Sequence, residues 1–183
     1  MLALLEEQAR NGHIDLYYGD ESRVCEQGYV PYGWQFKDEK VGVPSTHGQG
    51  LNCFGLLSRT NHLLFATTEQ NVNADFIVQQ LEQFSMNLKK QTVVVLDNAK
   101  VHKSRKVKER LHYWQNRGLY IFYLPPYCPH LNIIERLWLE LKSRWLRPED
   151  YRSAQTLFLA TTLALGAVGK DLFIQYGKFN FIN

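Results

Sequence analysis

Three acidic residues, Asp20, Asp97 and Glu135, have the residue type and the local setting for metal-dependent chemistry. Each lies where a strand or a helix would direct its side chain toward a shared pocket. Carboxylates from separate elements can hold a pair of Mg²⁺ ions for reactions at phosphodiesters. The sequence therefore predicts a site in which these three acids are both the catalytic residues and the metal ligands.

Asp97 follows an unbroken apolar run. Residues 92–96 read Thr-Val-Val-Val-Leu, which predicts a strand that is buried on both faces of a sheet. Open α/β sheets bind ligands just beyond the carboxyl ends of their strands, so Asp97 is well placed for a site. The alternative is that Asp97 and Asn98 only form a turn after the strand.

Asp20 follows an alternating pattern that predicts a strand near 13–19. Ile14, Leu16 and Tyr18 would share one face, and Asp20 continues that face. A carboxylate on a buried face is costly unless it is paired, protonated or bound to a metal, so Asp20 requires a partner. Glu21 must point the other way, as a solvated residue or as a group that supports the metal ligands.

Glu135 lies in the first turn of an expected amphipathic helix, after a proline-rich loop. The helix is predicted near 133–146, with Glu135 on the flank of its apolar stripe. The stripe consists of Ile134, Leu137, Trp138, Leu141 and Trp145. As an alternative, Asn132 and Glu135 have the form of a capping box, in which the glutamate only accepts from the backbone N–H of Asn132. The conjunction with the other two acids favours a role in catalysis.

The elements that must position these acids form an α/β pattern. Strands are expected near 13–19, 49–57, 62–67, 92–97 and 119–123, and helices near 73–88, 103–117, 133–146 and 153–167. The first three strands should form an antiparallel meander. With 183 residues and 45% hydrophobic content, we expect a single domain over 1–183.

Three stretches resemble the DDE transposases of bacterial insertion sequences, specifically the IS630 group related to Tc1/mariner elements. They are residues 17–22 (Tyr-Tyr-Gly-Asp-Glu-Ser), 94–104 (Val-Val-Leu-Asp-Asn-Ala-Lys-Val-His-Lys-Ser) and 124–138 (Leu-Pro-Pro-Tyr-Cys-Pro-His-Leu-Asn-Ile-Ile-Glu-Arg-Leu-Trp). The 37 residues between Asp97 and Glu135 fit the short spacing of this group. Departures from its usual pattern occur at Cys128, His130 and Ile133, none of which is one of the three acids.

The resemblance implies an RNase H-like fold, with a mixed five-stranded sheet flanked by helices on both faces. It also implies a transposase that uses two Mg²⁺ ions, for which Mn²⁺ can substitute. Such an enzyme cleaves transposon ends, joins them to target DNA, and acts as a homo-oligomer on DNA. Relatives carry an N-terminal helix-turn-helix region. We expect this region to be absent from 1–183, so that the chain is a fragment, a separate reading-frame product or a truncated copy. A separate helix-turn-helix polypeptide is one possible source of the missing region.

Two other functions remain open. An RNase H-like structure-selective nuclease would share the three acids and would hydrolyse DNA without strand transfer. A non-catalytic transposase remnant would bind DNA or a partner subunit as a regulator.

Charge is distributed unevenly along the chain. Residues 1–75 contain 5 basic and 10 acidic groups, whereas residues 76–183 contain 16 basic and 8 acidic groups. Basic residues crowd the region after Asp97, where Lys108 and Arg110 also lie, and this pattern favours nucleic-acid binding. For His102, the functional roles are contact with a phosphate or with the outer shell of a metal ion, and a satisfied structural role is favoured over both. The expected DNA-binding residues are Lys100, His102, Lys103, Arg105, Lys106, Arg136 and Lys142.

The remaining features predict a cytosolic protein that is not associated with a membrane, and the resemblance implies the bacterial cytosol and an association with the nucleoid. The N-terminus lacks a basic leader, and residues 157–169 are too few to span a bilayer. Cys25, Cys53 and Cys128 form no Cys-x-x-Cys pair, so we expect them to be reduced and buried. The aromatic segment 28–37 would either stack on DNA or cover the edge of its own domain.

Overall fold

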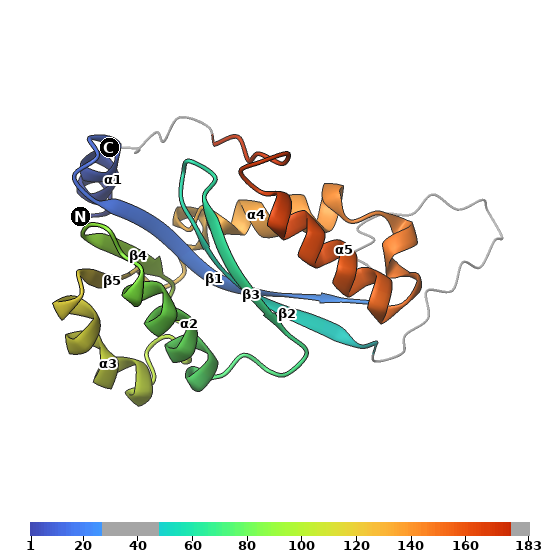
Figure 1. Ribbon diagram of the computed structural model, residues 1–183, viewed down its shortest axis with the longest axis horizontal. Coiled ribbons are helices and arrows are strands. Elements are labelled where there is room, and N and C mark those ends of the chain that lie inside the picture. Colours follow the sequence, from blue (N-terminus) through green and yellow to red (C-terminus); the bar gives the residue numbers. More distant parts are fainter. Residues whose placement is uncertain (27–47, 177–183) are drawn as a thin grey trace.

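The protein is described by a computed structural model that covers residues 1–26 and 48–176, so the aromatic segment 28–37 lies outside the described residues. Five strands form one mixed sheet in the order β3-β2-β1-β4-β5 (Figure 1). The strands are β1 (Asp15–Cys25), β2 (Gly50–Leu57), β3 (Leu63–Thr68), β4 (Thr92–Leu96) and β5 (Leu119–Tyr123). All five predicted strands are confirmed.

Strand direction divides the sheet into two parts. The pairs β1–β2 and β2–β3 are antiparallel, which confirms the predicted meander. The pairs β1–β4 and β4–β5 are parallel, and the chain passes through α2 (Ala74–Met86) and α3 (Arg105–Asn116) to make these connections. All five residues of β4 are buried, as the apolar run predicts for a strand that is covered on both faces.

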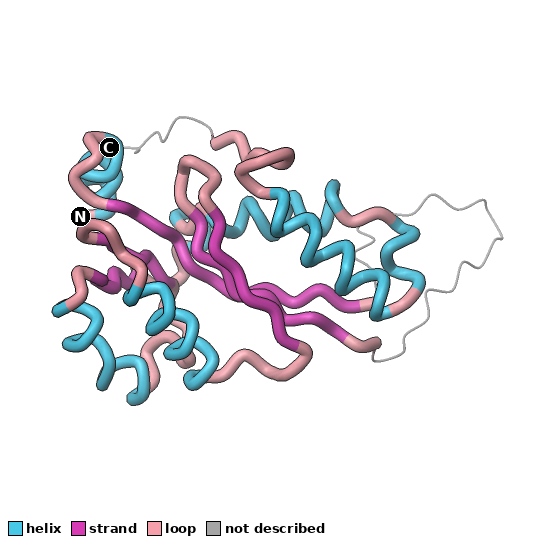
Figure 2. The backbone as a smooth tube through the Cα atoms, in the orientation of Figure 1, coloured by secondary structure: helices cyan, strands magenta, loops and turns pink. Residues whose placement is uncertain are grey.

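Helices cover both faces of the sheet, and Figure 2 shows the strands between the two helical layers. On one face, α2 and α3 pack against Phe54, Leu56 and Val94. On the other face, α4 (Ile134–Glu140) and α5 (Ala154–Ala167) pack with Leu16, Tyr18 and neighbouring apolar residues. Because side chains alternate along a strand, adjacent residues such as Cys53 and Phe54 belong to opposite cores.

Three local features differ from the predictions. The chain begins with a helix that was not predicted, α1 (Leu2–Arg10), which buries Leu2 and Glu6. Its signal was the helical spacing of Leu2, Leu5 and Ala9. Strand β1 continues to Cys25, so Asp20 lies within the strand and not after it. The helix predicted near 133–146 remains α-helical only to Glu140 and then forms a π-helical turn over Leu141–Trp145.

The cysteines are free thiols, as expected, but only Cys53 is buried, and Cys25 and Cys128 are partly exposed. Burial raises the pKa of the Cys53 thiol to about 12. In residues 1–26 and 48–176, no helix has the length and apolar character needed to cross a membrane.

Candidate active site

Asp20 and Asp97 are placed by the pairing of two neighbouring parallel strands. The β1–β4 ladder ends at the pair formed by Tyr18 and Val95. Each acid lies two residues further along its own segment, Asp20 in β1 and Asp97 just after β4. Since side chains alternate, the register directs Asp20 to the face that holds Tyr18, which is the face covered by α4.

A glycine lets α4 pack closely over this part of the sheet. Gly55 in β2 pairs with Asp20. A Cβ atom at Gly55 would lie 3.0 Å from Cδ1 of Ile134 and 3.2 Å from Cη2 of Trp138, both in α4. The close approach brings the indole of Trp138 to Asp20, and its Nε1 donates a hydrogen bond to Oδ2 of Asp20 over 3.2 Å. Trp138 was expected only as part of the apolar stripe.

Asn132 links the start of α4 to β1 by a hydrogen bond. Its buried side chain donates from Nδ2 to the carbonyl oxygen of Gly19 over 3.2 Å. The residue that caps α4 is Ile133, and no side-chain hydrogen bond caps the helix. The capping-box alternative is therefore wrong, and Glu135 is not used to cap the helix. Instead, Glu135 lines a cavity of about 300 Å³ together with Asp97 and Asn132.

The electrostatics of the three acids are coupled. Burial raises the pKa of Asp20 to about 7, and the negative charges of Glu135, Glu21 and Asp97 add to this effect. Burial also raises the pKa of Glu135, to which Asp97 contributes, while Lys142 opposes the shift. The structure thus brings all three predicted acids into one region in which negative charge accumulates.

The donor set fits a hard divalent cation. Carboxylate oxygens are the ligands that Mg²⁺ and Mn²⁺ prefer. A cation would offset both the burial of Asp20 and the repulsion from its acidic neighbours, which together raise its pKa. Among the described residues, no group of three or more His, Cys, Asp or Glu side chains is arranged so that it could hold a metal ion. The fit is therefore one of donor chemistry and not of a preformed cluster.

His102 does not face solvent. Its side chain is 0% exposed, so the prediction that it contacts DNA is wrong. Nδ1 lies 2.7 Å from Oδ1 of Asp97, and Nε2 lies 2.9 Å from Oε2 of Glu21. Burial alone would lower the pKa of His102, but its contacts with Asp97 and Glu21 raise it to about 9. Glu21 points away from the face of Asp20, as its place in the strand predicts.

The predicted DNA-binding cations fall into two groups. Some form ion pairs within the protein: Arg105 with Glu109, Lys106 with Asp75, and Arg136 with Glu140. Others lie beside the acids. Lys103 favours the charged form of Asp97, and Lys142 favours the charged form of Glu135. Lys100 is exposed near the end of β4. The DNA-binding role of both groups remains a prediction.

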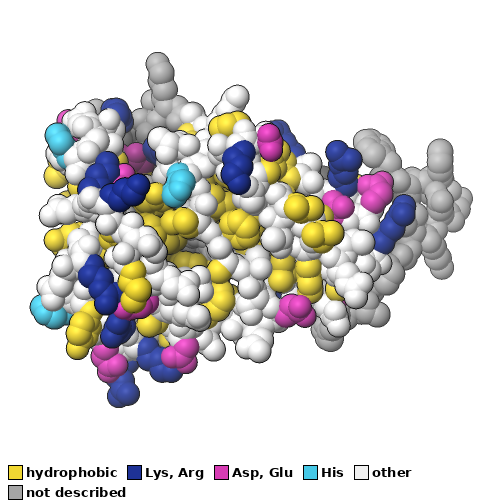
Figure 3. Space-filling model, in the orientation of Figure 1, with side chains coloured by type: hydrophobic (Ala, Val, Ile, Leu, Met, Phe, Trp, Pro, Cys, Tyr) yellow, Lys and Arg dark blue, Asp and Glu magenta, His cyan; other side chains and the backbone are white. Residues whose placement is uncertain are grey.

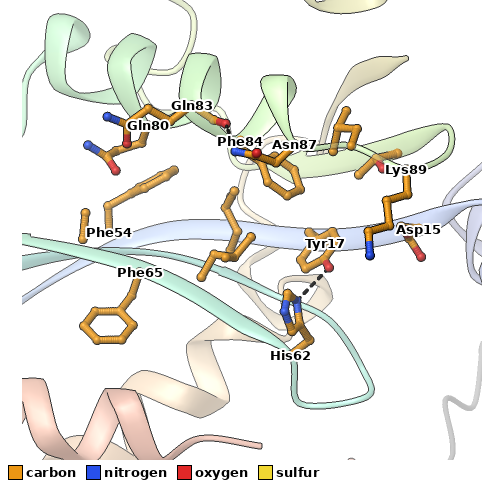
Figure 4. Close-up of a pocket in the computed structure, with 15 residues that line it drawn as sticks. Asp15, Tyr17, Phe54, His62, Phe65, Gln80, Gln83, Phe84, Asn87 and Lys89 are labelled. Carbon is orange, nitrogen blue, oxygen red and sulfur yellow. Dashed lines mark hydrogen bonds between the residues drawn. The ribbon is translucent and has the colours of Figure 1, made fainter. Parts of the chain in front are cut away.

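A larger cavity lies elsewhere. It has a volume of about 530 Å³ and is lined by Tyr17, Phe54, His62 and Phe84, on the face of the sheet that carries α2 (Figure 4). The hydroxyl of Tyr17 and Nδ1 of His62 form a hydrogen bond of 2.8 Å in this cavity. None of the three acids lines it, so cavity size does not identify the candidate site.

The sequence of residues 15–158 matches the family described as DDE superfamily endonuclease, and this range contains all three acids. No curated protein matches the chain. Among solved structures, a chain in the intasome of simian T-cell lymphotropic virus, in complex with PP2A regulatory subunit B56 gamma, aligns with a TM-score of 0.61. It is 11% identical, over 88% of this chain and 50% of that chain.

Two further structures show the same architecture. The Mos1 mariner paired end complex with Mn gives a TM-score of 0.59 at 16% identity, over 91% of this chain and 56% of that chain. The catalytic core domain of BIV integrase gives a TM-score of 0.54 at 15% identity, over 87% of this chain and 86% of that chain. These similarities confirm the expected RNase H-like fold. The present chain spans about half the length of the intasome and Mos1 chains.

Proposed function

This chain belongs to the DDE superfamily endonuclease family, and we propose that it is a transposase of the IS630 group within the Tc1/mariner superfamily. In this proposal it cleaves the ends of an insertion sequence and joins them to target DNA. The main observation behind the proposal is that the three acids lie in one region. Asp20 and Asp97 continue one strand register, and Glu135 lines the same cavity as Asp97.

Asp20, Asp97 and Glu135 would hold two Mg²⁺ ions, and Mn²⁺ would substitute for them. When bound there, the ions would supply Lewis-acid chemistry, namely activation of a water or 3′-hydroxyl and stabilisation of the departing oxygen at the scissile phosphate. The protein's own residues hold the acids in place. Trp138 orients Asp20 by its indole N–H, and the backbone N–H of Ala99 donates to Oδ1 of Asp97.

The proposed partners are transposon ends and target DNA. Lys103 and Lys142, which lie beside the acids, and the exposed Lys100 would contact them. A phosphate backbone is attracted to such cations in a salt-dependent manner. We further propose that the chain acts as a homo-oligomer on DNA in the bacterial cytosol. A helix-turn-helix polypeptide would recognise the element ends.

The substitution Asp97→Asn tests the metal assignment. It removes one negative charge and leaves the shape of the side chain nearly unchanged. Loss of several kcal/mol of transition-state stabilisation predicts a fall of about 1,000-fold in Mg²⁺-dependent nicking of element-end DNA. The salt-sensitive binding of DNA should change little. Nicking assays on supercoiled and end-containing DNA would measure the effect.

Asp75→Asn is the matched control, because Asp75 is an exposed aspartate of α2 that pairs with Lys106 away from the three acids. It should nick DNA at the parental rate. If Asp97→Asn nicks as fast as Asp75→Asn, the metal assignment is wrong.

Strand transfer with pre-cut ends distinguishes the proposal from the two alternative functions. Joining of a 3′-hydroxyl to target DNA supports a transposase. Hydrolysis without joining would replace this conclusion by a structure-selective nuclease. DNA binding without either reaction would indicate a regulator derived from a transposase.

A further inference from the structure

The backbone hydrogen bonds that pair β1 with β4 end just before the two acids. Their ladder ends at Tyr18 and Val95. Beyond this pair, β1 continues to Cys25 and is paired with β2, whereas β4 ends at Leu96. Backbone hydrogen bonds between β1 and β4 therefore do not fix the position of Asp97 relative to Asp20.

A side-chain bridge spans the gap. Glu21, the residue after Asp20, approaches Nε2 of His102 to 2.9 Å, and Nδ1 of His102 lies 2.7 Å from Asp97. The contact with Glu21 is close but is not an aligned hydrogen bond. The imidazole is fully buried, so water does not reach its two ring nitrogens. The bridge thus joins the segment that carries Asp20 to the segment that carries Asp97.

The bridge also selects which oxygen of Asp97 is available. Oδ1 takes part in both hydrogen bonds of the carboxylate, one from the backbone N–H of Ala99 at 2.9 Å and one with Nδ1 of His102 at 2.7 Å. In the described part of the chain, no hydrogen bond to Oδ2 is found. The carboxylate is therefore held in one orientation, with one oxygen engaged and the other available to a ligand.

A residue of β5 holds the backbone of His102 in place. The hydroxyl of Tyr123 donates to the backbone carbonyl of His102 over 2.8 Å. The backbone N–H of Lys103 donates to the carbonyl of Ala99, which closes the turn that carries His102. Movement of the imidazole away from Asp97 would have to break these contacts, so His102 occupies a fixed position.

We propose that Glu21 and His102 are positioning residues that fix the Asp97 carboxylate and its placement relative to Asp20. This inference rests on the proposed function, because the positioning matters only if the acids bind a divalent cation. Partners that hold metal ligands in place typically contribute roughly 10- to 100-fold to metal affinity or activity. A purely structural bridge would stabilise the fold and leave metal affinity unchanged.

Mn²⁺ binding measured by electron paramagnetic resonance tests the inference without relying on catalysis. In His102→Ala, the Kd for Mn²⁺ should rise by about 10- to 100-fold. Because His102 is buried, Glu21→Gln is the second variant. Glu21 is 30% exposed, so its substitution should leave the protein folded, and we expect the Kd to rise by about 10-fold.

A double-mutant cycle shows whether the two residues act as one unit. If Glu21 acts through His102, Glu21→Gln should have no further effect on the Kd in the His102→Ala background. Additive effects would mean that Glu21 does not act through the imidazole. With DNA as substrate, both variants should lower kcat and leave KM nearly unchanged, because neither side chain contacts DNA.

His62→Ala is the matched control. It removes a histidine whose hydrogen bond with Tyr17 is 2.8 Å, on the face of the sheet that carries α2. Its affinity for Mn²⁺ should equal that of the parent.

The outcomes separate this inference from the proposed function. A parent protein that binds no Mn²⁺ overturns the proposed function, and the positioning role with it. A parent that binds Mn²⁺, together with folded His102 and Glu21 variants of equal affinity, overturns the positioning role alone.

Discussion

Two carboxylates, Glu82 and Asp20, have opposite electrostatic surroundings in this protein. Glu82 of α2 accepts hydrogen bonds from the Nη2 of Arg110 at 2.6 Å, from the Nε1 of Trp114 at 2.9 Å, and from Arg117. Asp20 also accepts from an indole, that of Trp138, but its charged neighbours are other acids. The two regions therefore share an indole donor and differ in the sign of the surrounding charge.

The pKa values express this difference. Burial alone would raise the pKa of Glu82, but its hydrogen bonds with Arg110, Arg117 and Trp114 lower it to about 2. Burial and neighbouring acids raise the pKa of Asp20 to about 7. The charge of Glu82 is neutralised within the chain, as expected for a structural ion-pair network. The charge around Asp20 is not neutralised, which is typical of a site that is completed by a ligand. Figure 3 shows how acidic and basic side chains mix over α2 and α3.

Removing Glu82 should have the largest effect on stability. In Glu82→Ala, the two arginines and the indole N–H lose a shared acceptor, so the free energy of unfolding should fall by about 3 kcal/mol. Urea denaturation would measure the change. Activity should be retained under conditions in which the variant is folded. A change below about 0.5 kcal/mol, the usual effect of a surface substitution, would contradict a structural role for the network.

The same network predicts a dependence of stability on pH. The folded-state pKa of Glu82, about 2, lies below its ordinary value of 4.5. Its contribution is therefore fully present above pH 4.5 and is lost as the pH falls toward 2. The difference in unfolding free energy between the parent and Glu82→Gln should shrink over this range. A difference that stays constant with pH would argue against the lowered pKa.

Substitution of Asp20 should raise the free energy of unfolding, by less than the loss expected for Glu82→Ala. In Asp20→Asn, the new amide oxygen still accepts from Trp138 and carries no charge, so the metal-free protein should be stabilised on the order of 2 kcal/mol at about pH 8. The folded-state pKa of Asp20 lies above its ordinary value of 3.8. Ionised Asp20 therefore lowers the free energy of unfolding, and this loss of stability is absent below pH 3.8 and complete above pH 7. Melting temperatures in a chelator at about pH 4 and about pH 8 would show the gain at the higher pH only. Destabilisation at the higher pH would contradict the prediction.

The smallest effect on stability is expected at Gly55. In Gly55→Ala, the new Cβ atom would lie 3.0 Å from Ile134 and 3.2 Å from Trp138, so α4 must move by a few tenths of an ångström. We expect a loss of about 1 kcal/mol in the free energy of unfolding. Activity should fall by about 10-fold, because α4 carries Glu135 and small displacements of catalytic groups are costly.

Gly166→Ala in α5 is the control for this substitution, since a Cβ atom there meets no heavy atom within 4 Å. It should leave DNA nicking unchanged and raise stability slightly, because alanine favours helix more than glycine does. Equal nicking rates for the two alanine variants would show that close packing of α4 at Gly55 does not position Glu135.

Much of the fold could be predicted from local patterns. The apolar run at residues 92–96 identifies a central strand without reference to any other part of the chain, and all of its residues are buried. Alternation placed Asp20 on the same face as Tyr18, and it placed Glu21 on the other face. The three acids of the candidate site were found in this way, because strand and helix periodicity are encoded by neighbouring residues.

Tertiary structure decided how these acids are held. Local sequence favoured a capping box at Asn132, but its side chain binds the carbonyl of Gly19, 113 residues away. Trp138 reaches Asp20 across 118 residues. His102 was expected to contact DNA, yet the folding of β1 against β4 buries it between Glu21 and Asp97. The sequence alone determined which residues we propose for the chemistry, because their types, their local periodicity and their conjunction can all be seen in it. Only the packed sheet and α4 decided their partners, because those contacts join segments that no local pattern connects.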